Sequence, residues 1–168
     1  VPLVPQIGAG MAASDGNGGA FVAGAYAWDS LFWFKKGWLG HFRGNGDLEW
    51  SRLFETWGVD GVAIQGLNPD GAGAVFVSGA TQGRLGAPSL GGTDAWLAKV
   101  DATGNLLWIH QFGTSAEDSC VGSAEDGSGG VILGGWTTGA LAGPFAGGND
   151  IWLARYDSGG NRLWIVQF

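Results

Sequence analysis

The two histidines, His41 and His110, are the side chains best suited to acid–base or metal chemistry. Neither stands in a spacing that such chemistry uses, for example His-x-x-x-His. Cys120 is the only cysteine, which excludes an internal disulfide, and a small buried side chain is its expected role. The sequence also lacks the Gly-x-Ser-x-Gly elbow of hydrolases and a phosphate-binding loop with its Lys. We therefore expect a protein that is not an enzyme and has no cofactor.

The motif Asp-Gly-x-Gly occurs three times, beginning at Asp15, Asp70 and Asp126. Such a motif could open a calcium loop, but the further carboxylates and the distal Glu that a calcium ion needs do not follow. Asp and Gly also favour tight turns, because Gly accepts a positive φ and Asp bonds its own backbone. We predict turns here and no metal site. Asp94 and Asp150 each follow a Gly-rich segment, and we expect their carboxylates to order it by accepting backbone hydrogen bonds.

These residues belong to three copies of one unit of about 56 residues. Three landmarks recur in register: Gly24, Gly79 and Gly135; Trp38, Trp96 and Trp152; and Trp50, Trp108 and Trp164, followed four residues later by Phe54, Phe112 and Phe168. The copies run over residues 1–55, 56–112 and 113–168, and the first is the most divergent. Together they are expected to form one segment of a single fold.

Each copy reads as four short strands joined by tight turns, which predicts an all-β chain. The first strand carries small residues, and the third, for example residues 96–100, is apolar on both faces. A four-stranded antiparallel blade of a β-propeller requires this, because it narrows toward the axis and packs between two neighbours. We predict three such blades. The alternative is a β-trefoil, which also has three four-stranded units, though usually shorter ones.

The second and third copies resemble the bacterial β-propeller repeat known as SBBP. The resemblance rests on the run from Asp94 to Trp108, DAWLAKVDATGNLLW, preceded by an Asp-x-x-Gly turn and the strand VFVSG. It extends over 56–168 and weakens over 1–55, where Lys36 stands at the position of Asp94. The resemblance implies a propeller fold and an extracellular or cell-surface location. It implies no shared catalytic motif.

Charge and hydropathy narrow the range of partners. The net charge is −7 and only eight residues are Lys or Arg, which argues against nucleic acid and against anionic membrane surfaces. No apolar run approaches the roughly 18 residues of a membrane span. The chain begins at Val1 and ends at Phe168 within an apolar run, so we expect it to be part of a larger protein.

One segment of the first copy differs in kind from its counterparts. Between Gly24 and Trp38 the sequence carries bulky aromatic residues, where the other copies carry Gly, Thr, Ala, Pro and Leu. Aromatic rings can anchor a protein partner or stack on a sugar, and they can equally cover an open blade face or a neighbouring subunit. The candidate binding residues are Tyr26, Trp28, Asp29, Phe32, Trp33 and Phe34.

Three blades cannot close a propeller, since known rings have at least about four. The terminal blades would then expose apolar faces larger than a monomer tolerates. A second copy, further blades or another protein could complete the ring. We therefore expect a non-enzymatic binding and assembly module that mediates protein–protein contacts. The alternative is a carbohydrate-binding lectin with a glycan as its partner.

Overall fold

The computed structural model describes residues 6–27, 35–56 and 61–168, and within them the chain is all-β. The strands form three separate four-stranded antiparallel sheets, each in the sequence order of its strands. Their bounds are β1 (Gln6–Ser14), β2 (Ala20–Ala27), β3 (Lys35–Phe42), β4 (Leu48–Phe54), β5 (Val62–Pro69), β6 (Val75–Thr81), β7 (Asp94–Val100), β8 (Leu106–Phe112), β9 (Asp118–Glu125), β10 (Val131–Thr137), β11 (Asp150–Tyr156) and β12 (Arg162–Gln167).

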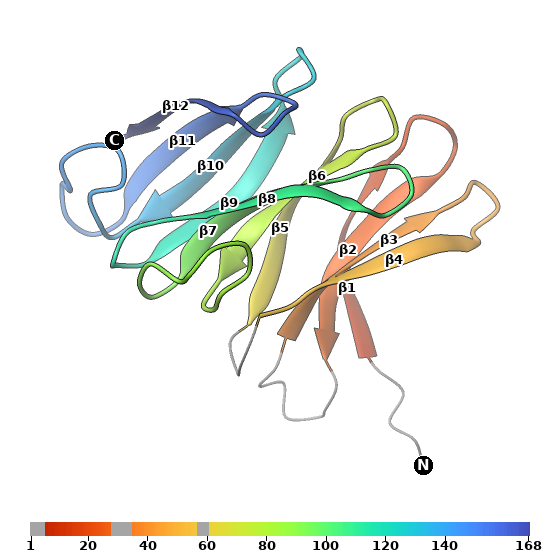
Figure 1. Ribbon diagram of the computed structural model, residues 1–168, viewed down its shortest axis with the longest axis horizontal. Helices are drawn as coiled ribbons and strands as arrows, with labels where there is room; N and C mark the ends of the chain where they lie inside the picture. Colours follow the sequence, from red (N-terminus) through yellow and green to blue (C-terminus); the bar gives the residue numbers. More distant parts are fainter. Residues whose placement is uncertain (1–5, 28–34, 57–60) are drawn as a thin grey trace.

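The three sheets follow one another as blades (Figure 1). We call them the first blade (β1–β4), the second blade (β5–β8) and the third blade (β9–β12). The predicted all-β fold of four-stranded antiparallel blades is confirmed. A β-trefoil would combine strands of all copies in one barrel, whereas here each copy keeps its strands in its own sheet.

The Asp-Gly-x-Gly motifs form the turns between the first and second strands of each blade, as predicted. Asp70 Oδ1 accepts hydrogen bonds from the backbone N–H groups of Ala72 and Ala74, at 2.9 and 3.0 Å. Asp15 and Asp126 bond the corresponding amides of their own turns. The Gly after each Asp has a positive φ, which a residue with a side chain rarely adopts.

The recurrent Gly of the second strand is explained by a β-bulge in the strand beside it. The register of β5 against β6 shifts between Ile64 and Gly66, which leaves Gln65 as the extra residue. The bulge pushes a carbonyl toward β6, so a Cβ on Gly79 would lie 2.0 Å from the Ala63 oxygen. Gly135 in the third blade meets a carbonyl oxygen at the same distance. Only Gly fits at this position.

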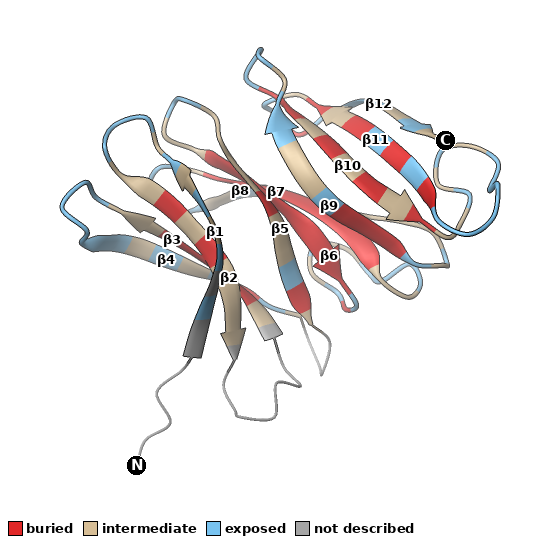
Figure 2. Ribbon diagram, turned by 180° about the vertical axis from the view of Figure 1, so that it is seen from behind, coloured by how far each residue is buried: buried red, intermediate tan, exposed pale blue. Residues whose placement is uncertain are grey.

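The core lies between the blades in two clusters, one at each junction. Every residue of β6 and β7 is buried, because the second blade has a neighbour on both faces (Figure 2). In β11 buried and exposed residues alternate, since only one face of the third blade is covered. Contact with a neighbouring blade on both faces is thus the physical reason that β6 and β7 are apolar on both faces.

The third-strand Trp residues of the second and third blades are buried at these junctions. Trp96 and Trp152 are both 0 % exposed. Each packs against the Phe that ends the preceding blade: the ring centroids of Phe54 and Trp96 are 5.1 Å apart, and those of Phe112 and Trp152 are 5.5 Å apart. An aromatic pair therefore recurs at each junction.

Candidate functional site

Five of the six residues predicted as a binding site lie outside the described residues. These are Trp28, Asp29, Phe32, Trp33 and Phe34. Tyr26 is described: it lies in β2, half-buried, and is opposite Lys36 of β3 in the sheet register. The proposed role of this segment in binding stays a prediction.

The third blade presents an apolar face toward solvent on the side away from the second blade. We call it the open face and define it by residues of β11, β12 and the C-terminal residue: Ile151, Leu153, Trp164, Val166 and Phe168. Ile151 and Phe168 are the most exposed of them, at 60 % and 69 %. The Phe168 N–H donates to the Ile151 carbonyl oxygen at 2.8 Å, which holds both residues at the same end of the sheet.

The same face of the second blade is covered. Ala95 and Leu97 stand at the positions of Ile151 and Leu153, and both are 0 % exposed. They belong to the core cluster that the second blade forms with the third. The open face is therefore equivalent to a surface of the second blade that lies in the interior. In the third blade no further blade of the described chain covers it.

The outer-strand Trp residues form a second contact that recurs at each junction. The Trp50 ring lies against the turn glycine Gly104 of the next blade, where a Cβ would stand 2.9 Å from the Trp50 Cδ2. The Trp50 Nε1–H also donates to the Ala102 carbonyl oxygen at 2.9 Å. Trp108 lies against Gly160 in the same way. Trp164 is the third Trp of this series and is 39 % exposed on the open face.

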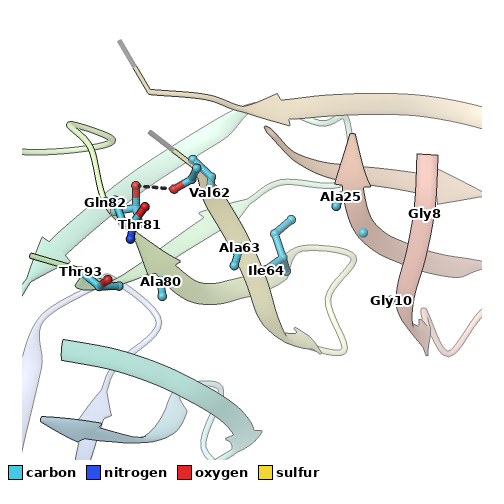
Figure 3. A pocket seen from close by; sticks show the side chains of 12 residues that line it. Gly8, Gly10, Ala25, Val62, Ala63, Ile64, Ala80, Thr81, Gln82 and Thr93 are labelled. Atoms are coloured by element: carbon cyan, nitrogen blue, oxygen red, sulfur yellow. Dashed lines mark hydrogen bonds between the residues drawn. The ribbon is translucent and has the colours of Figure 1, made fainter. Parts of the chain in front are cut away.

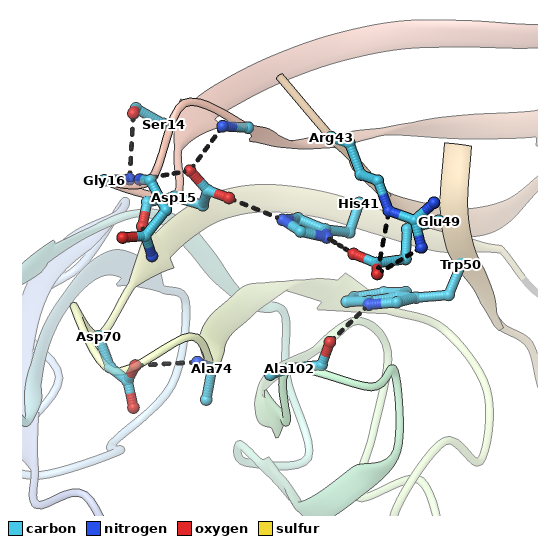
Figure 4. A network of polar contacts seen from close by, with 12 residues as sticks. Ser14, Asp15, Gly16, His41, Arg43, Glu49, Trp50, Asp70, Ala74 and Ala102 are labelled. Carbon is cyan, nitrogen blue, oxygen red and sulfur yellow. Dashed lines mark hydrogen bonds and ion pairs between the residues drawn. The ribbon is translucent and has the colours of Figure 1, made fainter. Parts of the chain in front are cut away.

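A polar network in the first blade resembles an acid–base constellation (Figure 4). The His41 ring lies between two carboxylates, with Nδ1 2.9 Å from Glu49 Oε2 and Nε2 3.0 Å from Asp15 Oδ2. The ring also stacks on Trp50, with the two centroids 5.7 Å apart. Each polar atom of the imidazole thus has a structural partner.

The other blades show that this pair is a repeated structural element. Lys99 and Arg155 occupy the position of His41 and form ion pairs with the turn aspartates Asp70 and Asp126, at 3.0 and 2.8 Å. A basic side chain of the third strand thus holds the Asp turn in every blade. Sequence reasoning missed this pairing, although positions 41, 99 and 155 share the spacing of the Trp landmarks.

The turn carboxylates are held ionised by these contacts. The backbone N–H of Ser128 and the Arg155 guanidinium lower the pKa of Asp126 well below its ordinary value. In the turn before β8, the Asn105 N–H and the Thr103 hydroxyl lower the pKa of Asp101 to about 2. Since their oxygens are occupied by protein donors, these carboxylates support the turn interpretation.

The loop before each third strand is held by a Gln–Asp pair. Gln111 Oε1 accepts the N–H groups of Leu85 and Gly86, and its Nε2–H donates to Asp94 Oδ2 at 2.7 Å. Asp94 Oδ2 also accepts the Leu90 N–H at 3.0 Å, which confirms its predicted role. Gln167 and Asp150 repeat the arrangement in the third blade. In the first blade Leu53 and Lys36 stand at these two positions.

The described residues contain no group of three or more His, Cys, Asp or Glu side chains that could hold a metal ion. Cys120 is buried in the junction between the second and third blades, and burial raises the pKa of its thiol.

In the part of the chain that is described, no helix is long and apolar enough to cross a membrane. The buried rings of Trp96 and Trp152 have no surface on which a sugar could stack.

The site geometry is thus an uncovered blade face together with structural polar clusters. No protein-family model matches the chain, and no curated protein matches its sequence. The resemblance to the SBBP repeat stays a prediction.

Proposed function

We propose that the chain is a non-enzymatic assembly module whose open face binds a further β-blade of the same kind. The observation that carries the proposal is the equivalence of the open face to the surface of the second blade that the third blade covers. An apolar surface of this kind is stabilised by burial against a complementary sheet. The SBBP resemblance alone favours a cell-surface or extracellular location.

The two existing junctions specify the chemistry of the partner. The partner blade brings a third-strand Trp against Phe168, as Trp152 lies against Phe112. It also brings a turn Gly beneath Trp164, as Gly160 lies beneath Trp108. For the 168-residue chain by itself, a second copy is the partner that supplies such a blade.

The third-strand Trp of the first blade adds little exposed apolar surface to that blade. Trp38 is only 8 % exposed, because its ring lies over Gly40, where a Cβ would stand 2.4 Å from the Trp38 Cη2. The second blade has Ala98 at the position of Gly40, and its Trp packs on the preceding blade instead. The third blade thus offers its open face as it stands, whereas the first blade of a second copy must turn Trp38 away from Gly40 before that ring can lie against Phe168.

Charged substitutions on the open face test the proposal. The double variant Ile151→Lys/Leu153→Lys is expected to lower self-association in sedimentation equilibrium and to lower binding of an apolar dye. Leu107→Lys is the matched control, since Leu107 is 54 % exposed but lies in β8, outside the open face. A double variant that associates and binds dye like the parent would contradict the proposal.

A further inference from the structure

A cleft of about 460 Å³ lies between the first and second blades (Figure 3). The inner strand of each blade forms a wall, with Gly8 and Gly10 of β1 on one side and Val62, Ala63 and Ile64 of β5 on the other. Its volume is within the range of small-molecule sites, which is about 300–1,000 Å³. The cleft is remote from the open face, since it lies at the other junction.

The corresponding space between the second and third blades is filled by side chains. There the bulge residue Gln65 extends to Ser119, with its Oε1 3.4 Å from the Ser119 hydroxyl. Ser78 and Ser123 meet beside them, with their hydroxyl oxygens 3.2 Å apart. A Cβ on Gly66 would lie only 2.2 Å from either hydroxyl, so this junction has no free room.

Two substitutions between the copies account for the cleft. Gly10 is the bulge residue of β1 and stands at the position of Gln65, so the filling side chain is missing. Ala63 stands at the position of Ser119, so its hydrogen-bonding partner is missing as well. The nearest atom to a Cβ on Gly10 would be the Ala23 carbonyl oxygen at 3.6 Å, an ordinary contact. Packing therefore does not require Gly here.

The lining indicates what the cleft can hold. Its walls are alkyl groups and glycine backbone, and no charged side chain is among the described lining residues. Polar groups come from Thr81, Gln82 and Thr93, which lie together at the end away from Gly8 (Figure 3). The Gln82 side-chain amide makes no hydrogen bond with other described residues and is exposed. An apolar lining with a few polar groups at one end favours a neutral, mainly apolar ligand.

We infer that this cleft is a binding site for a small, neutral, mainly apolar molecule with one hydrogen-bonding group, which Gln82 or Thr93 receives. The inference is independent of the assembly proposed for the open face, because no residue is shared between the two surfaces.

The test uses N-phenylnaphthylamine, a neutral fluorescent probe with two apolar ring systems and one N–H donor. All proteins carry Ile151→Lys/Leu153→Lys, so that the probe does not report on the open face. Gly10→Gln/Ala63→Ser installs the pair that fills the other junction. We expect this filled variant to bind the probe at least about tenfold more weakly than its parent, with an unchanged melting curve.

A second measurement locates the probe without any substitution in the cleft. In the parent, the Ala63 and Ala80 methyl resonances are expected to shift when the probe is added, while that of the buried Ala98 is not. A filled variant that binds the probe as tightly as its parent would overturn the inference. Unshifted Ala63 and Ala80 methyls in the presence of bound probe would overturn it too.

Discussion

The ring of Phe112 meets the ring of Trp152 edge to face, with centroids 5.5 Å apart and planes at 74°. Phe112 ends the second blade and Trp152 lies in the third, so the pair joins two repeats across their junction. Phe54 and Trp96 pair at the equivalent positions one repeat earlier, with centroids 5.1 Å apart and planes tilted at 34°. Phe168 is the next Phe in this series, and it lies exposed on the open face.

Truncation of a junction Trp should destabilise the fold strongly. Trp152→Ala is expected to cost about 3–5 kcal/mol, because it removes a 0 % exposed side chain and leaves a cavity. Denaturant unfolding measures this change. Trp164→Ala is the control, since Trp164 is 39 % exposed and should cost much less. Equal costs for the two variants would show that the junction is not the core of the protein.

Loss of the Gln–Asp pair should loosen the loop before β7. Gln111→Leu introduces the residue that the first blade carries and leaves the amides of Leu85 and Gly86 without their acceptor. We expect a cost of about 1–3 kcal/mol. Hydrogen exchange should become faster at these amides.

The matched control is Gln82→Leu, in the same loop, whose side chain makes no hydrogen bond with the described residues. It should leave both stability and exchange unchanged. Unchanged exchange in Gln111→Leu would show that the loop is ordered without this pair.

Acid should destabilise the protein through its turn carboxylates. Asp101 has a pKa of about 2 in the folded chain, below the ordinary value of 3.8, so the unfolded state binds more protons between these values. The stability from this group is therefore complete above about pH 4 and is lost as the pH falls toward 2.

Thermal melting at a series of pH values measures this loss. Asp101→Asn should lose less stability than the parent between pH 4 and about 2, because its side chain no longer titrates. Glu125→Gln, which changes an exposed carboxylate with no described hydrogen bond, should follow the parent. The interpretation is wrong if Asp101→Asn has the same acid dependence as the parent.

Calcium should leave the melting temperature unchanged. The Asp turns bond their own backbone amides, and the described residues offer no cluster of three ligands. Millimolar calcium or a chelator is expected to shift melting by less than about 1 °C, because only a ligand of the folded state stabilises it. A rise of several degrees would show a metal site.

Local and periodic features could be predicted from the sequence. The turn at Asp70 depends on residues within four positions, and the burial of Trp96 follows from its recurrence at blade spacing. The pairing of His41 with Asp15 could not be predicted, because it joins strands through a register that single residues do not reveal.

The cleft and the open face depend on differences between copies rather than on what they share. In the sequence Gly10 looks like any other small residue of a first strand. Only the register of the bulge shows that it is equivalent to Gln65. The sequence around Ile151 predicts a buried strand. Ile151 is exposed because no blade packs on that face of the third blade. The repeats in the sequence thus predict the blade, and the three-dimensional register is needed to find its sites.

Sedimentation velocity of the unmodified chain at micromolar concentrations tests the central claim most directly. If the open face is an assembly surface, the weight-average mass should exceed the 17.3 kDa of one chain and rise with concentration. A mass of one chain at every concentration, together with no binding of an apolar dye, would contradict the account.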